Sequence, residues 1–437
     1  MRIKDLLEID YILLLAAVVL SFFGVLFIYS SGVTSAGVLV SEEYIRQIIW
    51  DVAGLVIVLV LVMVDYRRIR DLTMYLYLGN LALLVYICLF GKEVNGARAW
   101  IGIGSFGIQP SEFAKITTIL FLARYLNDTR RSPPKSFSRF VVSCLIVFVP
   151  MGIILIQPDF GTSLVFIPIL VTMVFIAGVS MRYIVFLAAC ISITAVLTVL
   201  PLWQRDIMRN TVPSLDILTN SRFILSAMAA LGFIAAVALV GFLLYKKRYF
   251  FWMLYGFIIV ILSLGLSYAA RLVLKDYQIK RLIVFLNPDV DPQGAGWHII
   301  QSITAIGSGG LAGKGYLQGT QSHYRFLPQQ STDFIFSIFT EEWGFLGGLL
   351  VFVLFLLICL RLLRITRITA DSFGAYITAG LAGVYIFHFL VNVGMTMGIM
   401  PITGIPLLFM SYGGSSVISS MTGIGLALSI YVRRYTH

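Results

Sequence analysis

Long apolar stretches separated by short polar segments make up almost the whole chain. A helix needs about 20 apolar residues to cross the hydrocarbon of a bilayer, so each stretch of that length predicts one membrane-spanning helix. The pattern predicts twelve spans, at about 11–30, 47–64, 73–91, 106–123, 140–157, 160–181, 183–203, 223–245, 249–270, 334–360, 372–400 and 402–432. We therefore expect an all-α, polytopic membrane protein with a single membrane domain over residues 1–437.

One polar segment is too long to be a simple connection between spans. Residues from about 275 to 333 are rich in Gly, Pro, Gln and Asp. Loops of this length without structure of their own are uncommon unless they are functional. Gly-Ser-Gly-Gly at 307–310 and Gly-Lys-Gly at 313–315 predict tight turns whose backbone amides face an anion, although Gly-rich loops are also ordinary linkers.

Composition and charge agree with a membrane protein. The chain is 59% hydrophobic and 12% charged, whereas soluble domains carry about 25% charged residues. The formal net charge is +11, but the basic residues lie in short clusters between apolar stretches, which membrane topology explains and which argues against nucleic-acid binding. Placing both termini in the cytoplasm puts most basic residues inside and the 275–333 loop outside. The four cysteines have no metal-ligand spacing, so we expect neither a disulfide nor a zinc site.

Two opposite charges lie near the start of the fourth predicted span. Pro110 marks a helix beginning, and Lys115 follows Glu112 by three residues, so these two side chains share one face of the helix. Charged groups at membrane depth cost about 2.5 to 3.5 kcal/mol each and usually face a cavity or one another. The pair is therefore either part of a binding site or a structural ion pair.

Three further residues are expected at the outer ends of spans. Arg98 and Trp100, in NGARAWIGI at 95–103, present a cation and an amphipathic ring there. Trp100 is either an interfacial anchor or a substrate contact, because tryptophan is enriched at that level of the membrane in any case. Asp159, in QPDFGTS, is either a site residue or the N-cap of the next helix.

Asp333 lies where the long loop meets the next span, directly ahead of an apolar run. Partial desolvation raises the pKa of a carboxyl towards the working range of a general base, so Asp333 is a candidate for that role. Alternatively, Thr332 and Asp333 cap the next helix. Glu341 and Glu342 follow two turns later, and we expect one of them to face the same cavity.

Two other features suit a phosphate-bearing ligand in a membrane cavity. The long loop is cationic despite its position outside, with Lys280, Arg281, Lys314 and Arg325. The segment PITGIPLLFMSYGGSS at 401–416 contains helix-breaking Pro and Gly residues. Irregular backbone at membrane depth is tolerated only where it lines a buried or wet cavity, so a cavity is predicted.

These stretches together resemble the SEDS family (shape, elongation, division and sporulation) over the whole chain. The matching text is NGARAWI at 95–101, QPSEFAK at 109–115, QPDFGTS at 157–163, NPDVDPQGAGWHIIQSITAIGSGGLAGKGYLQGTQS at 287–322, FLPQQSTDFIF at 326–336 and PITGIPLLFMSYGGSS at 401–416. The Gly-Ser-Gly-Gly and Gly-Thr-Gln-Ser forms resemble the elongation branch, RodA, more than the division branch, FtsW.

The resemblance implies a peptidoglycan glycosyltransferase of the bacterial cytoplasmic (inner) membrane that polymerises lipid II during elongation and releases undecaprenyl diphosphate. It implies a class B penicillin-binding protein and the elongation machinery as partners, and it leaves open a divalent cation, Mg²⁺ or Mn²⁺, at the leaving diphosphate. Asp333 matches the family's essential loop aspartate. The resemblance also offers candidates for substrate contact, namely Arg98, Trp100, Glu112, Lys115, Asp159, Lys314 and Gln321.

The chain departs from the family pattern in two ways. The family usually has ten spans, and the additional pair at 223–270 is interpreted as an inserted transmembrane hairpin that preserves the sidedness of the following spans. Gln330 and Ser331 stand where an acidic residue and a histidine are commoner.

Two other hypotheses remain open. A lipid II flippase also needs many spans and buried charges, but its polar groups should run from one face of the membrane to the other. A non-catalytic scaffold predicts that replacing Asp333 with alanine changes no activity.

Overall fold

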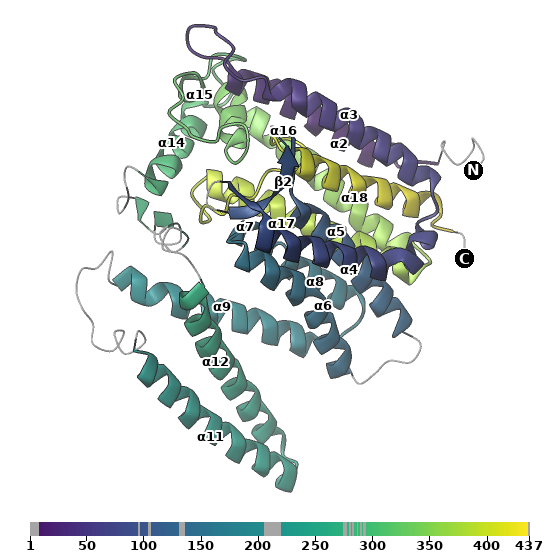
Figure 1. The fold of residues 1–437 in the computed structure, drawn as a ribbon, viewed down its shortest axis with the longest axis vertical. Coiled ribbons are helices and arrows are strands. Elements are labelled where there is room, and N and C mark those ends of the chain that lie inside the picture. The colour runs from purple at the N-terminus through teal and green to yellow at the C-terminus, as the bar shows by residue number, and fades with distance from the viewer. Residues whose placement is uncertain are drawn as a thin grey trace. The chain divides into compact units, whose positions relative to one another are not determined.

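The computed structural model describes residues 8–94, 97–103, 106–130, 136–204, 220–273 and 294–435, together with positions 278, 281, 284, 285, 287, 288 and 291. The chain divides into two compact units, Met1–Val179 with Trp297–His437, and Ser180–Gly296. Figure 1 shows the helices of each unit. Each unit is described below by itself.

The larger unit is a helical bundle with one small sheet. Its helices before the second unit are α2 (Tyr11–Gly32), α3 (Glu43–Met63), α4 (Tyr66–Phe90), α5 (Pro110–Asp128), α6 (Ser136–Ile156), α7 (Phe160–Leu164) and α8 (Phe166–Ile176). Those after it are α14 (Ala295–Ser308, from Trp297 onward), α15 (Thr320–His323), α16 (Ile335–Ile368), α17 (Ser372–Thr396) and α18 (Gly414–Val432).

The smaller unit consists of three long helices in its described part, α9 (Met181–Trp203), α11 (Ser221–Tyr245) and α12 (Arg248–Val273). Helix α12 packs against both of the others. The helices α11 and α12 coincide with the hairpin predicted at 223–270. Thr198 of α9 donates to Ser267 of α12 at 3.1 Å, so hydroxyl pairs supplement the apolar packing between these two helices.

Every predicted span overlaps a helix, but ten helices of the described chain are long and apolar enough to cross a membrane. The protein is therefore a multi-pass membrane protein, whereas the expected count of twelve is not reached by these criteria. Helix α5 is not one of these ten helices, because Glu112, Lys115 and Arg124 interrupt its apolar sequence. The span predicted at 160–181 is divided into the short helices α7 and α8.

The bundle is organised around α17 and α18. In the apolar part of each helix, 72% of the α17 residues and 78% of the α18 residues are buried, whereas the buried share in α4 is 22%. Helix α17 packs against α5, α8 and α16, and α18 packs along α3, as Figure 1 shows in yellow and purple. Outer helices expose large apolar side chains such as Val56 and Leu59 of α3, as expected for surfaces that face lipid.

Two local features add detail to the expected all-α fold with its long polar segment. Residues between α4 and α5 form an antiparallel sheet of three strands, β1 (Lys92–Val94), β2 (Ala97–Ile103) and β3 (Phe106–Ile108). The 275–333 segment contains α14 and α15. The predicted helix break is present, because α18 begins at Gly414 and the backbone before it is non-helical, with φ of +71° at Gly404 and +67° at Phe409.

Candidate functional site

A cavity of about 760 Å³ lies beside the small sheet of the larger unit. Its wall comes from the first turns of α3, strands β2 and β3, the start of α5, the segment before α16 and the non-helical segment before α18. Three residues chosen from the sequence line it, namely Trp100, Glu112 and Asp333. The lining also includes residues that the sequence analysis did not single out, among them Glu43, Trp50, Gln109 and Tyr412.

Asp333 is half-buried in this wall, and its backbone is held on both sides. Its N–H donates to the Gln329 carbonyl at 3.2 Å, and its own carbonyl accepts from Nδ2 of Asn392 at 3.0 Å. The N-cap position of α16 belongs to Phe334, so Asp333 is not the cap residue that was the alternative. The fold thus presents an aspartate to a cavity from a fixed backbone position.

Trp100 reaches the cavity from the middle strand of the sheet. Gly102 and Gly107 are paired between β2 and β3, and a Cβ at Gly107 would lie 2.9 Å from the Trp100 ring. Glycine is therefore needed where the indole crosses the neighbouring strand. The sheet gives Trp100 a supported position in the wall, in addition to any role at the membrane interface.

Glu112, Lys115 and His388 form a buried group that we call the cavity cluster. Lys115 Nζ donates to both carboxylate oxygens of Glu112 at 2.9 and 2.8 Å and lies 3.1 Å from His388 Nε2. His388 Nδ1 lies 3.1 Å from the Pro406 carbonyl, which only accepts, so Nδ1 carries the hydrogen and Nε2 accepts from Lys115. Glu112 lines the cavity, whereas Lys115 lies behind it as its ion-pair partner.

Asp159 has the geometry of an N-cap and a link to the cavity. Its Oδ1 accepts from the Thr162 N–H at 3.1 Å, and Oδ2 accepts from Nε2 of Gln109, a lining residue, at 2.8 Å. Removal from water raises the pKa of this carboxyl above its ordinary value, and the hydrogen bonds from Thr162 oppose that shift only in part. Asp159 thus supports the wall from behind.

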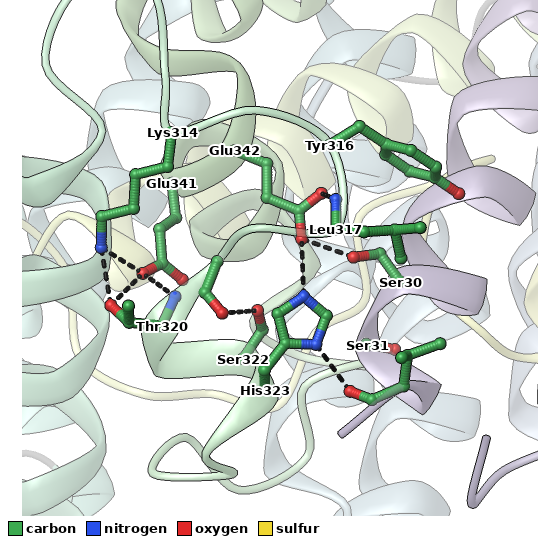
Figure 2. A network of polar contacts seen from close by, with 12 residues as sticks. Ser30, Ser31, Lys314, Tyr316, Leu317, Thr320, Ser322, His323, Glu341 and Glu342 are labelled. Carbon is green, nitrogen blue, oxygen red and sulfur yellow. Dashed lines mark hydrogen bonds and ion pairs between the residues drawn. The ribbon is translucent and has the colours of Figure 1, made fainter. Parts of the chain in front are cut away.

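Arg98, Lys314 and Gln321 do not line the cavity. Arg98 is exposed on β2. Lys314 donates from Nζ to Glu341 Oε1 and to Thr320 Oγ1, both at 2.7 Å, and the Gln321 N–H donates to the same Glu341 oxygen at 3.0 Å (Figure 2). The Lys314 charge that was expected to face a phosphate is therefore already paired with a fully buried carboxylate.

Glu342 occupies the neighbouring position of α16 and has its own partners. Its side chain accepts from the Ser30 hydroxyl of α2 and from the Leu317 N–H at 3.0 Å, and Oε1 lies 3.9 Å from His323 Nε2 (Figure 2). Neither Glu341 nor Glu342 lines the cavity, contrary to the expectation that one of them would. We call Glu341, Glu342, Lys314 and His323 the clamp, because they join the outer loop to α16 and, through Ser30, to α2.

The backbone around the clamp is adapted to close approach. Gly344 has φ +65° and ψ −161° inside α16, and this break lets the Phe345 N–H donate to the Gly310 carbonyl at 2.8 Å. A Cβ at Gly319 would lie 3.0 Å from Glu341 Oε2 and 3.2 Å from Glu342 Oε1. The loop therefore passes between the two carboxylates at a residue without a side chain.

The chemistry available at the cavity is that of carboxylates, two indoles and several hydroxyl and amide side chains. In the described residues, no group of three or more His, Cys, Asp or Glu side chains could hold a metal ion. The side chains that the structure describes therefore do not form a metal site by themselves. A half-buried aspartate in the wall of a cavity of this size is, in contrast, well placed to accept a proton from a bound hydroxyl.

Known proteins that resemble this chain do so over its full length. Residues 10–232 and 203–436 match the family model FtsW/RodA/SpoVE, described as cell cycle protein. Peptidoglycan glycosyltransferase RodA of Treponema pallidum is 50% identical over 434 residues, which cover 99% of this chain and 100% of that protein. Peptidoglycan glycosyltransferase MrdB of Escherichia coli K12 is 31% identical, with 98% and 95% covered.

Solved structures agree with the sequence comparison. One from work on structural coordination of polymerization and crosslinking by a peptidoglycan synthase complex matches with a TM-score of 0.67 at 26% identity, over 98% of this chain and 99% of the other. The crystal structure of Thermus thermophilus rod shape determining protein RodA has the same fold, with a TM-score of 0.60 at 23% identity and 98% of each chain covered. The chain belongs to the FtsW/RodA/SpoVE family, also known as the SEDS family.

Proposed function

We propose that this protein is a peptidoglycan glycosyltransferase that polymerises lipid II into β-1,4-linked glycan strands during cell elongation. The observation that carries the proposal is Asp333, a half-buried aspartate in the wall of a cavity that also presents Trp100 and Glu112. The proposal is supported by the identity of 50% to a peptidoglycan glycosyltransferase over nearly the whole chain.

In the proposed reaction, Asp333 acts as the general base. The 4-hydroxyl oxygen of the acceptor sugar attacks the anomeric carbon of the donor, the proton of that hydroxyl moves to Asp333, and the bond from the anomeric carbon to the diphosphate breaks. Attack from the face opposite the leaving group inverts the configuration. Undecaprenyl diphosphate departs with the bonding electrons, so the charges and atoms balance.

Other residues would orient the substrate. Trp100 offers a flat face on which a sugar ring can lie, and Gln109 joins the cavity wall to Asp159. Glu112 is held in place by Lys115, which fixes one polar group of the wall. We assign these residues to positioning, and Asp333 alone to proton transfer.

A divalent cation, Mg²⁺ or Mn²⁺, remains a proposal for the leaving diphosphate. Because the described side chains form no three-ligand group, the diphosphate itself would have to supply ligands. Titrating EDTA and then Mg²⁺ or Mn²⁺ into the polymerisation assay tests this. Full activity in EDTA would reject the cation.

We further propose a class B penicillin-binding protein as the partner, within the elongation machinery. The synthase complex among the structural relatives supports a partner of this kind. The proposed location is the bacterial cytoplasmic membrane, with both termini in the cytoplasm and the cavity facing outward. Labelling of single cysteines on intact cells, introduced at exposed positions Tyr435 and Phe326, tests the topology.

The decisive experiment is polymerisation of labelled lipid II in detergent, with and without the co-expressed partner, in moenomycin to block contaminating polymerases. We expect glycan ladders from the wild type and a loss of at least about 100-fold in Asp333→Asn, as general-base removal typically causes. Asp128→Asn is the matched control, because Asp128 is a half-exposed carboxylate that pairs with Arg70 and does not line the cavity. Absence of ladders from the wild type, together with translocation of lipid II in liposomes, would favour a flippase.

A further inference from the structure

His323 lies between a backbone carbonyl and a carboxylate. Its Nδ1 is 2.7 Å from the Val33 carbonyl oxygen, and a carbonyl only accepts, so Nδ1 carries a hydrogen. Its Nε2 is 3.9 Å from Glu342 Oε1 and makes no hydrogen bond. In a neutral ring, Nε2 would turn a lone pair towards this carboxylate, and the two would repel each other. A second proton on Nε2 turns the contact into an ion pair.

Charge balance in the clamp leads to the same conclusion. Glu341 and Glu342 are both 0% exposed, and Lys314 supplies one positive charge. If both glutamates are ionised and His323 is neutral, one negative charge remains buried without a positive partner, which costs several kcal/mol. With a protonated His323, two negative and two positive charges balance.

We infer that the clamp is a positioning device that depends on charge: Glu341, Glu342, Lys314 and a protonated His323 fix the segment that leads to Asp333. This inference rests on the proposed function for its kinetic consequence, but not for the protonation state itself. None of the four clamp residues lines the cavity, so they act through the loop and not on the substrate.

Each element packed around His323 contributes the groups that decide its charge. Helix α16 supplies Glu342, with Glu341 beside it, and α2 supplies the Ser30 hydroxyl that donates to Glu342. The 313–319 segment supplies Lys314, bound to Glu341, and Tyr316, whose hydroxyl donates to the Leu26 carbonyl at 3.0 Å. Among these described groups, the two carboxylates are the sites of negative charge that a second proton on His323 can balance.

The clamp is connected to Asp333 through a short series of hydrogen bonds. The Lys314 and Gly315 N–H groups donate to the backbone carbonyls of Glu341 and Glu342 at 3.1 and 2.9 Å, so the loop follows α16. Beside His323, the Ser322 carbonyl accepts from Gln330 Nε2 at 3.1 Å.

Gln330 itself lies in the turn that ends at Asp333, where the Asp333 N–H donates to the Gln329 carbonyl at 3.2 Å. Release of the clamp would therefore loosen the turn that carries the proposed base. A clamp that depends on the second proton of His323 should weaken when that proton is lost at higher pH.

The protonation state can be measured directly by NMR of the full chain in detergent with ¹⁵N-labelled histidine. The sequence contains four histidines, and His323→Gln assigns the resonances of interest. We expect both ring nitrogens of His323 to be protonated at about pH 6.5, and the second proton to be lost in Glu342→Gln. A neutral His323 at that pH, with a water molecule bridging Nε2 and Glu342, would overturn the inference whatever the activity.

The kinetic consequence is measured as kcat for lipid II from about pH 6 to pH 8.5, in the wild type and in Glu342→Gln. Both share Asp333, so the ratio of the two kcat values removes the titration of the base. We expect the kcat of the wild type divided by that of Glu342→Gln to fall about tenfold across this pH range while KM changes little. The variant has one carboxylate fewer in the clamp, so its clamp does not need a charged His323.

The outcomes separate the two proposals. A constant ratio would overturn the positioning role, and unchanged kcat in Lys314→Met would do the same. Absence of polymerisation by the wild type at every pH would instead contradict the proposed function, and the NMR result would still decide the charge of His323. Thermal unfolding of each variant confirms that the compared proteins are folded.

Discussion

The cavity cluster and the clamp contain the same residue types but use their histidines in opposite ways. In both, Nδ1 donates to a backbone carbonyl, which leaves Nε2 to face a charged side chain. His388 faces the ammonium of Lys115 at 3.1 Å and accepts from it, whereas His323 faces the carboxylate of Glu342 at 3.9 Å. The first ring is therefore neutral, and the second is the one that we infer to be charged.

The difference teaches that the number of carboxylates sets the charge of the imidazole. One glutamate and one lysine already balance in the cavity cluster, so a charged His388 would add an uncompensated cation. The clamp has two glutamates for one lysine, so its histidine is needed to complete the balance. Its Lys314 side chain is 26% exposed, whereas that of Lys115 is 2% exposed, so the cavity cluster should be the less tolerant of substitution.

The largest effect is expected when the ion pair of the cavity cluster is broken. Lys115→Met leaves the Glu112 carboxylate buried without its partner, which typically costs about 3–5 kcal/mol of folding stability. Thermal unfolding in detergent measures the loss. The double variant Glu112→Gln/Lys115→Met removes both charges and should recover most of it. A single variant as stable as the wild type would show that the pair contributes no net stability.

A smaller effect is expected when the clamp is crowded without a change in charge. Gly319→Ala places a Cβ against Ser322 Oγ, its nearest neighbour, and 3.0 Å from Glu341 Oε2, and should cost roughly 1–3 kcal/mol of folding stability and lower kcat. Gly152→Ala is the matched control, because a Cβ there meets no atom within 4 Å and lies inside α6. Equal melting temperatures for the two variants would contradict the close approach at Gly319.

The smallest effect separates the two histidines by pH. A histidine that is protonated beside a carboxylate contributes stability at low pH, and that contribution is lost as the pH rises. The difference in folding stability between wild type and His323→Asn should therefore shrink from about pH 6 to about pH 8.5. The corresponding difference for His388→Asn should stay constant, because its ring is neutral throughout. Parallel pH curves for both variants would remove the distinction.

Local patterns in the sequence predicted the helices and their interruptions. Every predicted apolar run overlaps a helix, although ten helices of the described chain are long and apolar enough to cross a membrane, and Pro and Gly located the break before α18. The spacing of three residues put Glu112 and Lys115 on one face, and the position of Asp159 ahead of an apolar run agreed with an N-cap. These features depend on neighbours within one or two turns, which is why the chain alone was sufficient.

Contacts between distant segments were beyond the sequence pattern. Lys115 and His388 are 273 positions apart, and Glu342 and Ser30 are 312 apart, so no periodicity relates them. The sequence suggested that Lys314 faces a phosphate, whereas in the structure it is paired with Glu341. This pairing could not be predicted, because it depends on the sharp turn at Gly313 and on the break in α16 at Gly344. The small sheet was missed because its strands are only 3, 7 and 3 residues long, too short to show a clear alternation of polar and apolar residues.

The Arg361 side chain donates to Asp10 at 2.7 Å and marks one polar boundary of the bundle on α16. About 20 helical residues cover the 30 Å of a bilayer's hydrocarbon, and that distance along α16 from Arg361 leads back to Glu341. The break at Gly344 lies between these two positions. We therefore expect the clamp near the level of the lipid headgroups, where protons from water would reach His323 without crossing the hydrocarbon. In that arrangement the thickness of the surrounding bilayer sets how deeply the two carboxylates lie.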